Sequence, residues 1–280
     1  MKKTRIIFVM ILKGFLACSL SYGDWSPHTI RLLNGSDKPI EMPAQIQIVT
    51  EKLNKVTAVP YIVYMPEKDR VLMLIAYEYP HEAALLTSDD RGATWSAPRF
   101  AHTDAEGKSD TGMGVGLTYL GDGHVLFMGG WRDHNQEGGV VWRSYDYGQT
   151  WQDPTPIPLA PGSQPWHTWD PLFVQRDAKT NAITRLIGAR YTVKYADPNP
   201  SGNDYHSRSY FVTSLDLGKT WTDGIAVPEW DGLNEIAFCQ AANGDLVAAC
   251  RTDKPTRFKD EIDHYEGLVV SISKDQGKTW

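Results

Sequence analysis

The stretch Ser88-Asp89-Asp90-Arg91-Gly92-Ala93-Thr94-Trp95 decides the fold, because its pattern Ser-x-Asp-x-Gly-x-Thr-Trp returns three more times. The other copies are residues 144–151, 214–221 and 273–280, and each keeps every fixed position of the pattern. The tryptophans that end successive copies lie 56, 70 and 59 residues apart. Spacings of this size are typical of the blades of a β-propeller rather than of a helical repeat. The pattern therefore predicts an all-β propeller of four-stranded antiparallel blades.

Each fixed position of the repeat has a local structural reason. Ser and Asp side chains accept hydrogen bonds from backbone N–H groups one or two residues on, and so hold a tight turn. Gly supplies the positive φ that such a turn needs. We expect Thr and Trp to begin the next strand, with the indole packing between neighbouring blades. The repeated aspartates are therefore expected to be structural and to bind no substrate.

The repeat resembles the Asp-box, or bacterial neuraminidase repeat, and from about residue 50 onward the chain resembles the sialidase superfamily. The resemblance implies a six-bladed propeller, of which about four blades are present. Because the chain stops on Trp280, before the outermost strand of the fourth blade, residues 24–280 are expected to be a C-terminally incomplete propeller domain. The motif is specific for the fold and not for the reaction, since several glycosidase families and some non-enzymatic propellers carry it.

The composition favours one β-rich domain that binds sugars. The repeat is spread evenly over the 280 residues, and 10 Trp and 13 Tyr suit stacking on sugar rings. The net charge of −6 argues against nucleic acid or an anionic membrane surface as a partner. The chain has no Gly-rich phosphate loop, Ser-His-Asp signature or usual metal-ligand spacing, so no cofactor and no metal is expected. The oligomeric state is not predicted.

Residues 1–23 resemble an export signal, with a basic start, an apolar run over 6–12 and small residues over 18–23. The prediction is a secreted or periplasmic protein. The four residues that end at Cys18 also resemble a lipoprotein box, so lipid attachment there stays open. No later stretch is apolar for long enough to span a bilayer, and no integral membrane span is predicted.

Short β-branched and aromatic runs bounded by Gly, Pro, Asp and Asn predict three strands before each repeat turn. The predicted strands are 61–65, 71–77 and 83–87; 115–120, 125–129 and 140–143; 172–175, 186–191 and 210–213; and 236–240, 246–251 and 268–272. Residues 28–56 precede the first blade and are candidates for an outer strand that closes the ring against the last blade.

The predicted blade topology selects the residues that can form a site. In a four-stranded blade, the turn between strands three and four lies on the same side as the turn between strands one and two. The repeats then occupy one face, and residues just before a first strand or just after a second strand converge on the opposite face. The candidates are Glu78, Asp110, Arg132, Trp169, Asp170, Arg190, Glu235 and Arg251. A ring of carboxylates, arginines and aromatics is what a polyhydroxylated ligand requires.

The sialidase resemblance implies roles for four of these residues. Glu235 and Arg251 match a family glutamate before a central strand and an arginine about fifteen positions later. In the family the glutamate polarises a tyrosine nucleophile, and the arginine is one of three that grip the substrate carboxylate. Asp110 matches a family pocket aspartate, and Glu78 falls near the aspartate that serves as acid/base. The nucleophilic tyrosine and the third arginine would lie beyond residue 280.

The chain also departs from the family pattern. Residues 58–60, Ala-Val-Pro, stand where the family has Arg-Ile-Pro, so the first arginine of the triad is absent. Arg132 and Arg190 are candidates to replace that cation, or else they form salt bridges with Asp133 or Asp170. The missing arginine puts specificity for a sialic acid in doubt.

These observations predict an exported, sialidase-like exo-glycosidase that hydrolyses a terminal acidic sugar from glycans. The resemblance implies retention of configuration through an aryl glycoside on tyrosine, an exception to the scheme with two carboxylates. Two alternatives stay open: a propeller hydrolase that cleaves a neutral sugar with two carboxylates, and a non-catalytic glycan-binding propeller. The 280-residue chain by itself is expected to be inactive, because it lacks a nucleophile that can be placed.

Overall fold

The computed structural model describes residues 29–32, 40–43, 47–79, 81–130, 139–158, 169–195, 205–253 and 267–280. The chain forms two compact units, Met1–Leu53 and Asn54–Trp280. In the first unit, strands β1 (Thr29–Leu32) and β2 (Ile40–Pro43) pair antiparallel with each other. The expected export signal and Cys18 lie outside the described residues.

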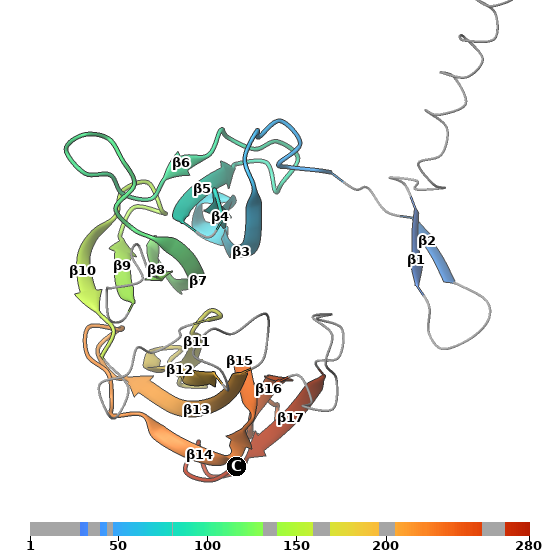
Figure 1. Ribbon diagram of the computed structural model, residues 1–280, viewed down its shortest axis with the longest axis vertical. Helices are drawn as coiled ribbons and strands as arrows, with labels where there is room; N and C mark the ends of the chain where they lie inside the picture. Colours follow the sequence, from blue (N-terminus) through green and yellow to red (C-terminus); the bar gives the residue numbers. More distant parts are fainter. Residues whose placement is uncertain are drawn as a thin grey trace, which may run out of the picture. The chain divides into compact units, whose positions relative to one another are not determined.

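The second unit is an all-β propeller whose antiparallel blades follow one another in chain order (Figure 1). The strands of blade one are β3 (Thr57–Met65), β4 (Arg70–Tyr77), β5 (Glu82–Ser88) and β6 (Arg99–Phe100). Those of blade two are β7 (Met113–Gly121), β8 (His124–Gly130), β9 (Val140–Ser144) and β10 (Gln152–Pro156). Those of blade three are β11 (Phe173–Arg176), β12 (Ile183–Tyr195), β13 (Tyr205–Ser214) and β14 (Ile225–Asp231).

Blade four has three strands among the described residues, β15 (Leu233–Gln240), β16 (Leu246–Thr252) and β17 (Leu268–Ser273). Every strand that the sequence predicts is present, usually one to several residues longer. The helical content of the described part of the chain is a single 3-10 turn, η1 (Pro66–Lys68), between β3 and β4. The prediction of a propeller with antiparallel blades is confirmed.

The four repeats form four nearly identical turns. In each turn the Gly N–H donates to the Ser hydroxyl at 2.7 or 2.8 Å, and the Thr hydroxyl donates to the Asp carboxylate at 2.6 Å. The glycine φ lies between +78° and +93°. These bonds span four residues rather than the one or two that the sequence predicts. In the first and last copies, the bond from Thr94 or Thr279 holds the pKa of Asp90 or Asp275 at about 2, so the turn itself satisfies these carboxylates.

The tryptophans of the second, third and fourth repeats, Trp151, Trp221 and Trp280, pack in the cores between blades. Where an outer strand follows among the described residues, the tryptophan precedes that strand instead of beginning it. Trp151 joins the core that blades one and two share and lies edge-on to Phe127 at 5.0 Å between ring centroids. Trp280 packs on Phe211 and Trp230 of blade three, with 4.8 Å between the two indoles. Fully burying one such large side chain contributes roughly 1.5–3 kcal/mol. The second, third and fourth repeats thus stabilise the contact between their own blade and the one before it.

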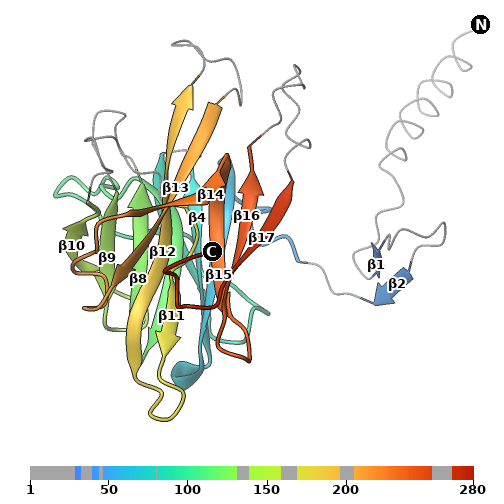
Figure 2. The same ribbon diagram turned by 90° about the horizontal axis from the view of Figure 1, so that it is seen from below.

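The repeat turns lie on the same side as the turns between first and second strands. Arg91 of the first repeat pairs with Asp69 beside η1 at 2.8 Å. In the last repeat, the Gln276 side-chain amide donates to the Gly244 carbonyl, in the β15–β16 turn, at 2.9 Å. Figure 2 shows η1 and the β11–β12 turn at the same end of this unit. We call this side the repeat face. The starts of β3, β7, β11 and β15 reach the opposite face, where the sequence predicts the site.

Candidate active site

Glu235 and Arg251 form an ion pair where β15 and β16 reach the opposite face. Arg251 lies across from Asn234 in the register, and a bulge between Asn234 and Ile236 makes Glu235 an extra residue. Glu235 has a φ of +42°, a conformation that costs a residue other than glycine roughly 1–3 kcal/mol. The bulge brings its Oε1 within 2.9 Å of Arg251 Nη1. The structure therefore places side by side the two residues that the sialidase resemblance singles out.

A buried polar network holds the ends of these strands. Asn234 is fully buried and donates through Nδ2 to Asp253 Oδ1 at 2.7 Å and to Ser207 Oγ at 3.2 Å. The Ser207 N–H donates to Asp253 Oδ2 at 2.6 Å. These bonds join β13, β15 and the end of β16. They fix the backbone on either side of Glu235 and Arg251. The sequence does not predict this network.

Asp170 lies just before β11 and approaches blade two closely. Its backbone passes so near Gly116 of β7 that a Cβ on Gly116 would lie 2.6 Å from the Asp170 carbonyl oxygen. Its Oδ2 atom is buried and has no hydrogen-bond partner among the described residues. Burial, followed by the negative charge of Glu235, raises the pKa of Asp170 to about 6. Asp170 therefore holds a proton well above the usual range of a carboxyl group.

Tyr61 of β3 completes a group of residues from three blades. Burial and the charges of Asp170 and Glu235 raise the pKa of Tyr61 above its usual range, so its hydroxyl stays protonated. We call Tyr61, Asp170, Glu235 and Arg251 the axial cluster. Tyr61 is not among the residues that the sequence predicts for the site. The available signal is its position directly after residues 58–60, at the start of a first strand.

Glu78 and Asp110 also follow the predicted topology, but each has a partner of its own. Glu78, just after β4, has a φ of +52° and pairs with Lys55. Asp110 lies in the connection between β6 and β7, with Oδ1 2.8 Å from His102 Nδ1. The contacts described for this structure join neither carboxylate to the axial cluster.

Arg190 lies inside a strand and does not reach the face opposite the repeats, so the expectation that it contributes to the site is wrong. The sequence predicts that its strand ends at residue 191, whereas β12 continues to Tyr195. Arg190 is therefore an interior strand residue, 2% exposed, with its guanidinium 4.8 Å from the ring of Trp221. Trp169 is half-buried and packs on the core between blades two and three. Arg132 lies outside the described residues.

The described residues contain no group of three His, Cys, Asp or Glu side chains that could hold a metal ion. No helix in the described part of the chain is long and apolar enough to cross a membrane.

No protein-family model matches the chain, and no curated protein matches it. Solved structures match at low sequence identity. A protein of unknown function from Dyadobacter fermentans is 19% identical, with 80% of this chain aligned to 67% of that one and a TM-score of 0.59. The NanB sialidase from Streptococcus pneumoniae is 14% identical over 85% of this chain and 54% of the sialidase, with a TM-score of 0.56. An α-L-arabinanase from Penicillium chrysogenum is 15% identical over 79% of this chain and 65% of its own, with a TM-score of 0.52.

These matches agree with the propeller fold found above. The chain spans about half of the sialidase and about two thirds of the arabinanase. Because one propeller fold carries many activities, the likeness by itself assigns no reaction.

Proposed function

We propose that this protein is a glycoside hydrolase that releases a terminal sugar from a glycan, with Asp170 and Glu235 as its two working carboxyl groups. The observation that carries the proposal is that the surroundings of Asp170 favour its protonated form, whereas those of Glu235 favour its ionised form. Asp170 is desolvated and lies near a negative charge, which raises its pKa to about 6, so it keeps its proton to a higher pH than an ordinary carboxyl group does. Glu235 is paired with Arg251, whose positive charge favours the ionised carboxylate. In enzymes, the acid and the base are usually recognised as two titratable groups whose environments push their pKa values apart.

The proposed chemistry follows from these states. Asp170 donates its proton to the glycosidic oxygen as the bond to the leaving group breaks. Glu235 either attacks the anomeric carbon or activates a water that does so. The neutral Tyr61 hydroxyl is available to donate a hydrogen bond to a substrate oxygen. The matched sialidase and arabinanase, which are propellers named as glycan-cleaving enzymes, support this assignment.

A second candidate is the sialidase-like route on an acidic sugar. Two observations favour it. Arg251 supplies a cation in the axial cluster, and the negative charge of Glu235 contributes to the raised pKa of Tyr61. In this route Arg251 binds the sugar carboxylate and Glu235 acts on a tyrosine. Arg251→Ala then weakens acidic glycosides much more than neutral ones, whereas in the route with two carboxylates it weakens both equally.

The proposal is tested with a panel of 4-nitrophenyl glycosides, neutral and acidic, and the full-length protein. We expect the wild type to release nitrophenol from at least one of them. Glu235→Gln removes the ionised carboxylate, and we expect kcat to fall by about 100-fold or more. Glu106→Gln, on an exposed loop, serves as the matched control. Equal rates for Glu235→Gln and the wild type would contradict the proposal.

Export is a separate part of the proposal and rests on residues 1–23. Expression of the whole gene with a C-terminal tag tests it. Recovery of a shortened protein outside the cytoplasm is expected, and a cytoplasmic protein that keeps its first residues would contradict it.

A further inference from the structure

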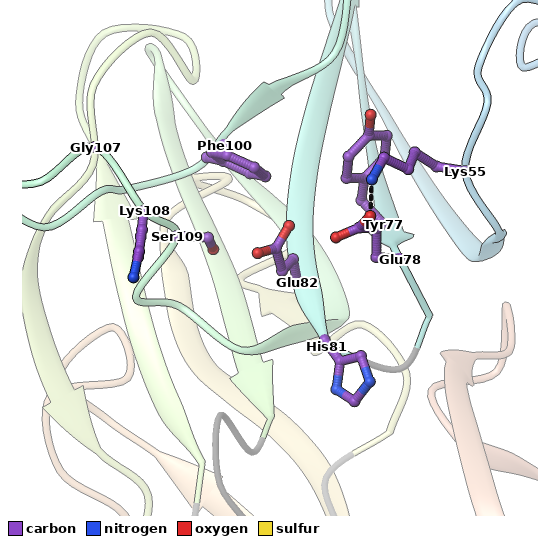
Figure 3. Close-up of a pocket in the computed structure, with 9 residues that line it drawn as sticks. All are labelled: Lys55, Tyr77, Glu78, His81, Glu82, Phe100, Gly107, Lys108 and Ser109. Carbon is purple, nitrogen blue, oxygen red and sulfur yellow. Dashed lines mark hydrogen bonds and ion pairs between the residues drawn. The ribbon is translucent and has the colours of Figure 1, made fainter.

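A second pocket lies in blade one, apart from the axial cluster, and we call it the rim pocket. Its volume is about 540 Å³, within the range of small-molecule sites. It shares no residue with the axial cluster. Figure 3 shows its lining side chains, which come from the segment before β3, the end of β4, the start of β5, β6 and the connection that follows β6. The lining residues are Lys55, Tyr77, Glu78, His81, Glu82, Phe100, Gly107, Lys108 and Ser109.

Two aromatic rings form part of the rim pocket. Tyr77 and Phe100 lie edge to face, with 6.2 Å between ring centroids. Such rings present apolar surface to the C–H faces of a sugar, and they lose little conformational entropy when they bind. This surface suits a ligand with both an apolar face and polar edges.

The connection that carries Lys108 is held in place by its own hydrogen bonds. The Asp104 N–H donates to the Lys108 carbonyl at 2.8 Å, and the Lys108 N–H donates to Asp104 Oδ1 at 2.8 Å. An antiparallel bridge between Thr103 and Ser109 closes the same loop. The backbone position of Lys108 is therefore set before any ligand binds, which lowers the entropy cost of binding.

The charges of the rim pocket balance and leave two groups of opposite sign available. Lys55 and Glu78 pair with each other. Figure 3 shows Glu82 between this pair and Lys108. Neither the Glu82 carboxylate nor the Lys108 ammonium has a side-chain partner within the described part of the chain. A carboxylate accepts hydrogen bonds from neighbouring hydroxyls and an ammonium donates to hydroxyl oxygens, so together they match an uncharged polyol.

We propose that the rim pocket binds a neutral hexose unit of a glycan, and that this unit lies on the leaving-group side of the cleaved bond. The two lysines and two glutamates of the lining leave the pocket without net charge, so an acidic unit would lose the hydration of its carboxylate without a net electrostatic gain. The place of this hexose in the reaction rests on the proposed hydrolase function. The binding of a neutral sugar does not.

Binding is tested by calorimetric titration of the full-length protein with lactose, cellobiose and maltose, and with glucuronic acid as the acidic probe. At least one neutral disaccharide is expected to bind more tightly than glucuronic acid. Glu82→Gln and Lys108→Met should each weaken that disaccharide about tenfold, the loss typical of a hydrogen bond to a charged group. The matched controls are Glu106→Gln and Lys179→Met, at exposed positions outside the pocket. Equal affinities in all five proteins, or tighter binding of glucuronic acid, would overturn the proposal.

Kinetics then separate this inference from the hydrolase function. On a glycan with a neutral hexose leaving group, Glu82→Gln should raise KM about tenfold, whereas on a 4-nitrophenyl glycoside, which has no such hexose, KM should not change. Hydrolysis that is insensitive to Glu82→Gln on both substrates refutes the rim pocket and leaves the hydrolase proposal intact. Sugar binding that depends on Glu82 in a protein without hydrolytic activity refutes the hydrolase proposal and leaves the pocket intact.

Discussion

Replacing Asp170 by asparagine should stabilise the protein near neutral pH. The pKa of Asp170 is raised from 3.8 to about 6 by burial and by the charge of Glu235. The folded state therefore holds this proton more tightly than the unfolded chain does. The free energy of unfolding consequently falls as the pH rises from about 4 to about 6, and this loss persists at higher pH. At about 1.36 kcal/mol per pKa unit, ionised Asp170 costs the folded protein up to about 3 kcal/mol.

An asparagine side chain cannot ionise, so the Asp170→Asn variant escapes this loss. We expect its free energy of unfolding to exceed that of the wild type by about 2–3 kcal/mol at about pH 7.5, and to match it within about 0.5 kcal/mol at about pH 4. Urea denaturation followed by tryptophan fluorescence at both pH values measures the difference. Asp223→Asn, at an exposed position before β14, controls for the removal of a carboxylate. An equal gain at both pH values, or no gain at about pH 7.5, would refute the reasoning.

Two substitutions test how the site is held. Gly116→Ala places a Cβ 2.6 Å from the Asp170 carbonyl oxygen. We expect the free energy of unfolding, measured by thermal denaturation, to fall by about 1–3 kcal/mol. An unchanged melting temperature would argue against the close approach. Asp253→Ala removes the acceptor for the Asn234 side-chain amide and for the Ser207 N–H. We expect the free energy of unfolding to fall by about 2–3 kcal/mol and kcat to fall with it. A variant that keeps both stability and kcat would show that the network does not position the site.

Local chemistry explains how much of the fold could be predicted. In the repeat Ser144–Trp151, the hydroxyl of Ser144, the carboxylate of Asp146 and the positive φ of Gly148 act within one turn. Such a pattern retains its meaning wherever it occurs in a chain. The adjacency of Glu235 and Arg251 was predictable for a similar reason, since a single hairpin joins their strands.

The remaining features depend on packing between blades, which sequence spacing does not encode. Tyr61 and Asp170 are far apart in the chain and influence each other only because blades one and three reach the same region. The close approach of the Asp170 backbone to Gly116 is likewise a contact between blades. The expectation for Arg190 was wrong because four further residues of β12 continue beyond the predicted end. That extension follows from pairing with β13, which continues to the last residue of β12, Tyr195.

The most direct test of the account is the dependence of Asp170→Asn on the leaving group. A general acid matters most when the departing oxygen is basic, so the measurement compares kcat/KM on a natural disaccharide unit with kcat/KM on a 2,4-dinitrophenyl glycoside of the same terminal sugar. We expect a fall of about 100-fold or more on the first substrate and of less than about tenfold on the second. An equal loss on both substrates, or no loss on either, would contradict the assignment of Asp170 as the acid.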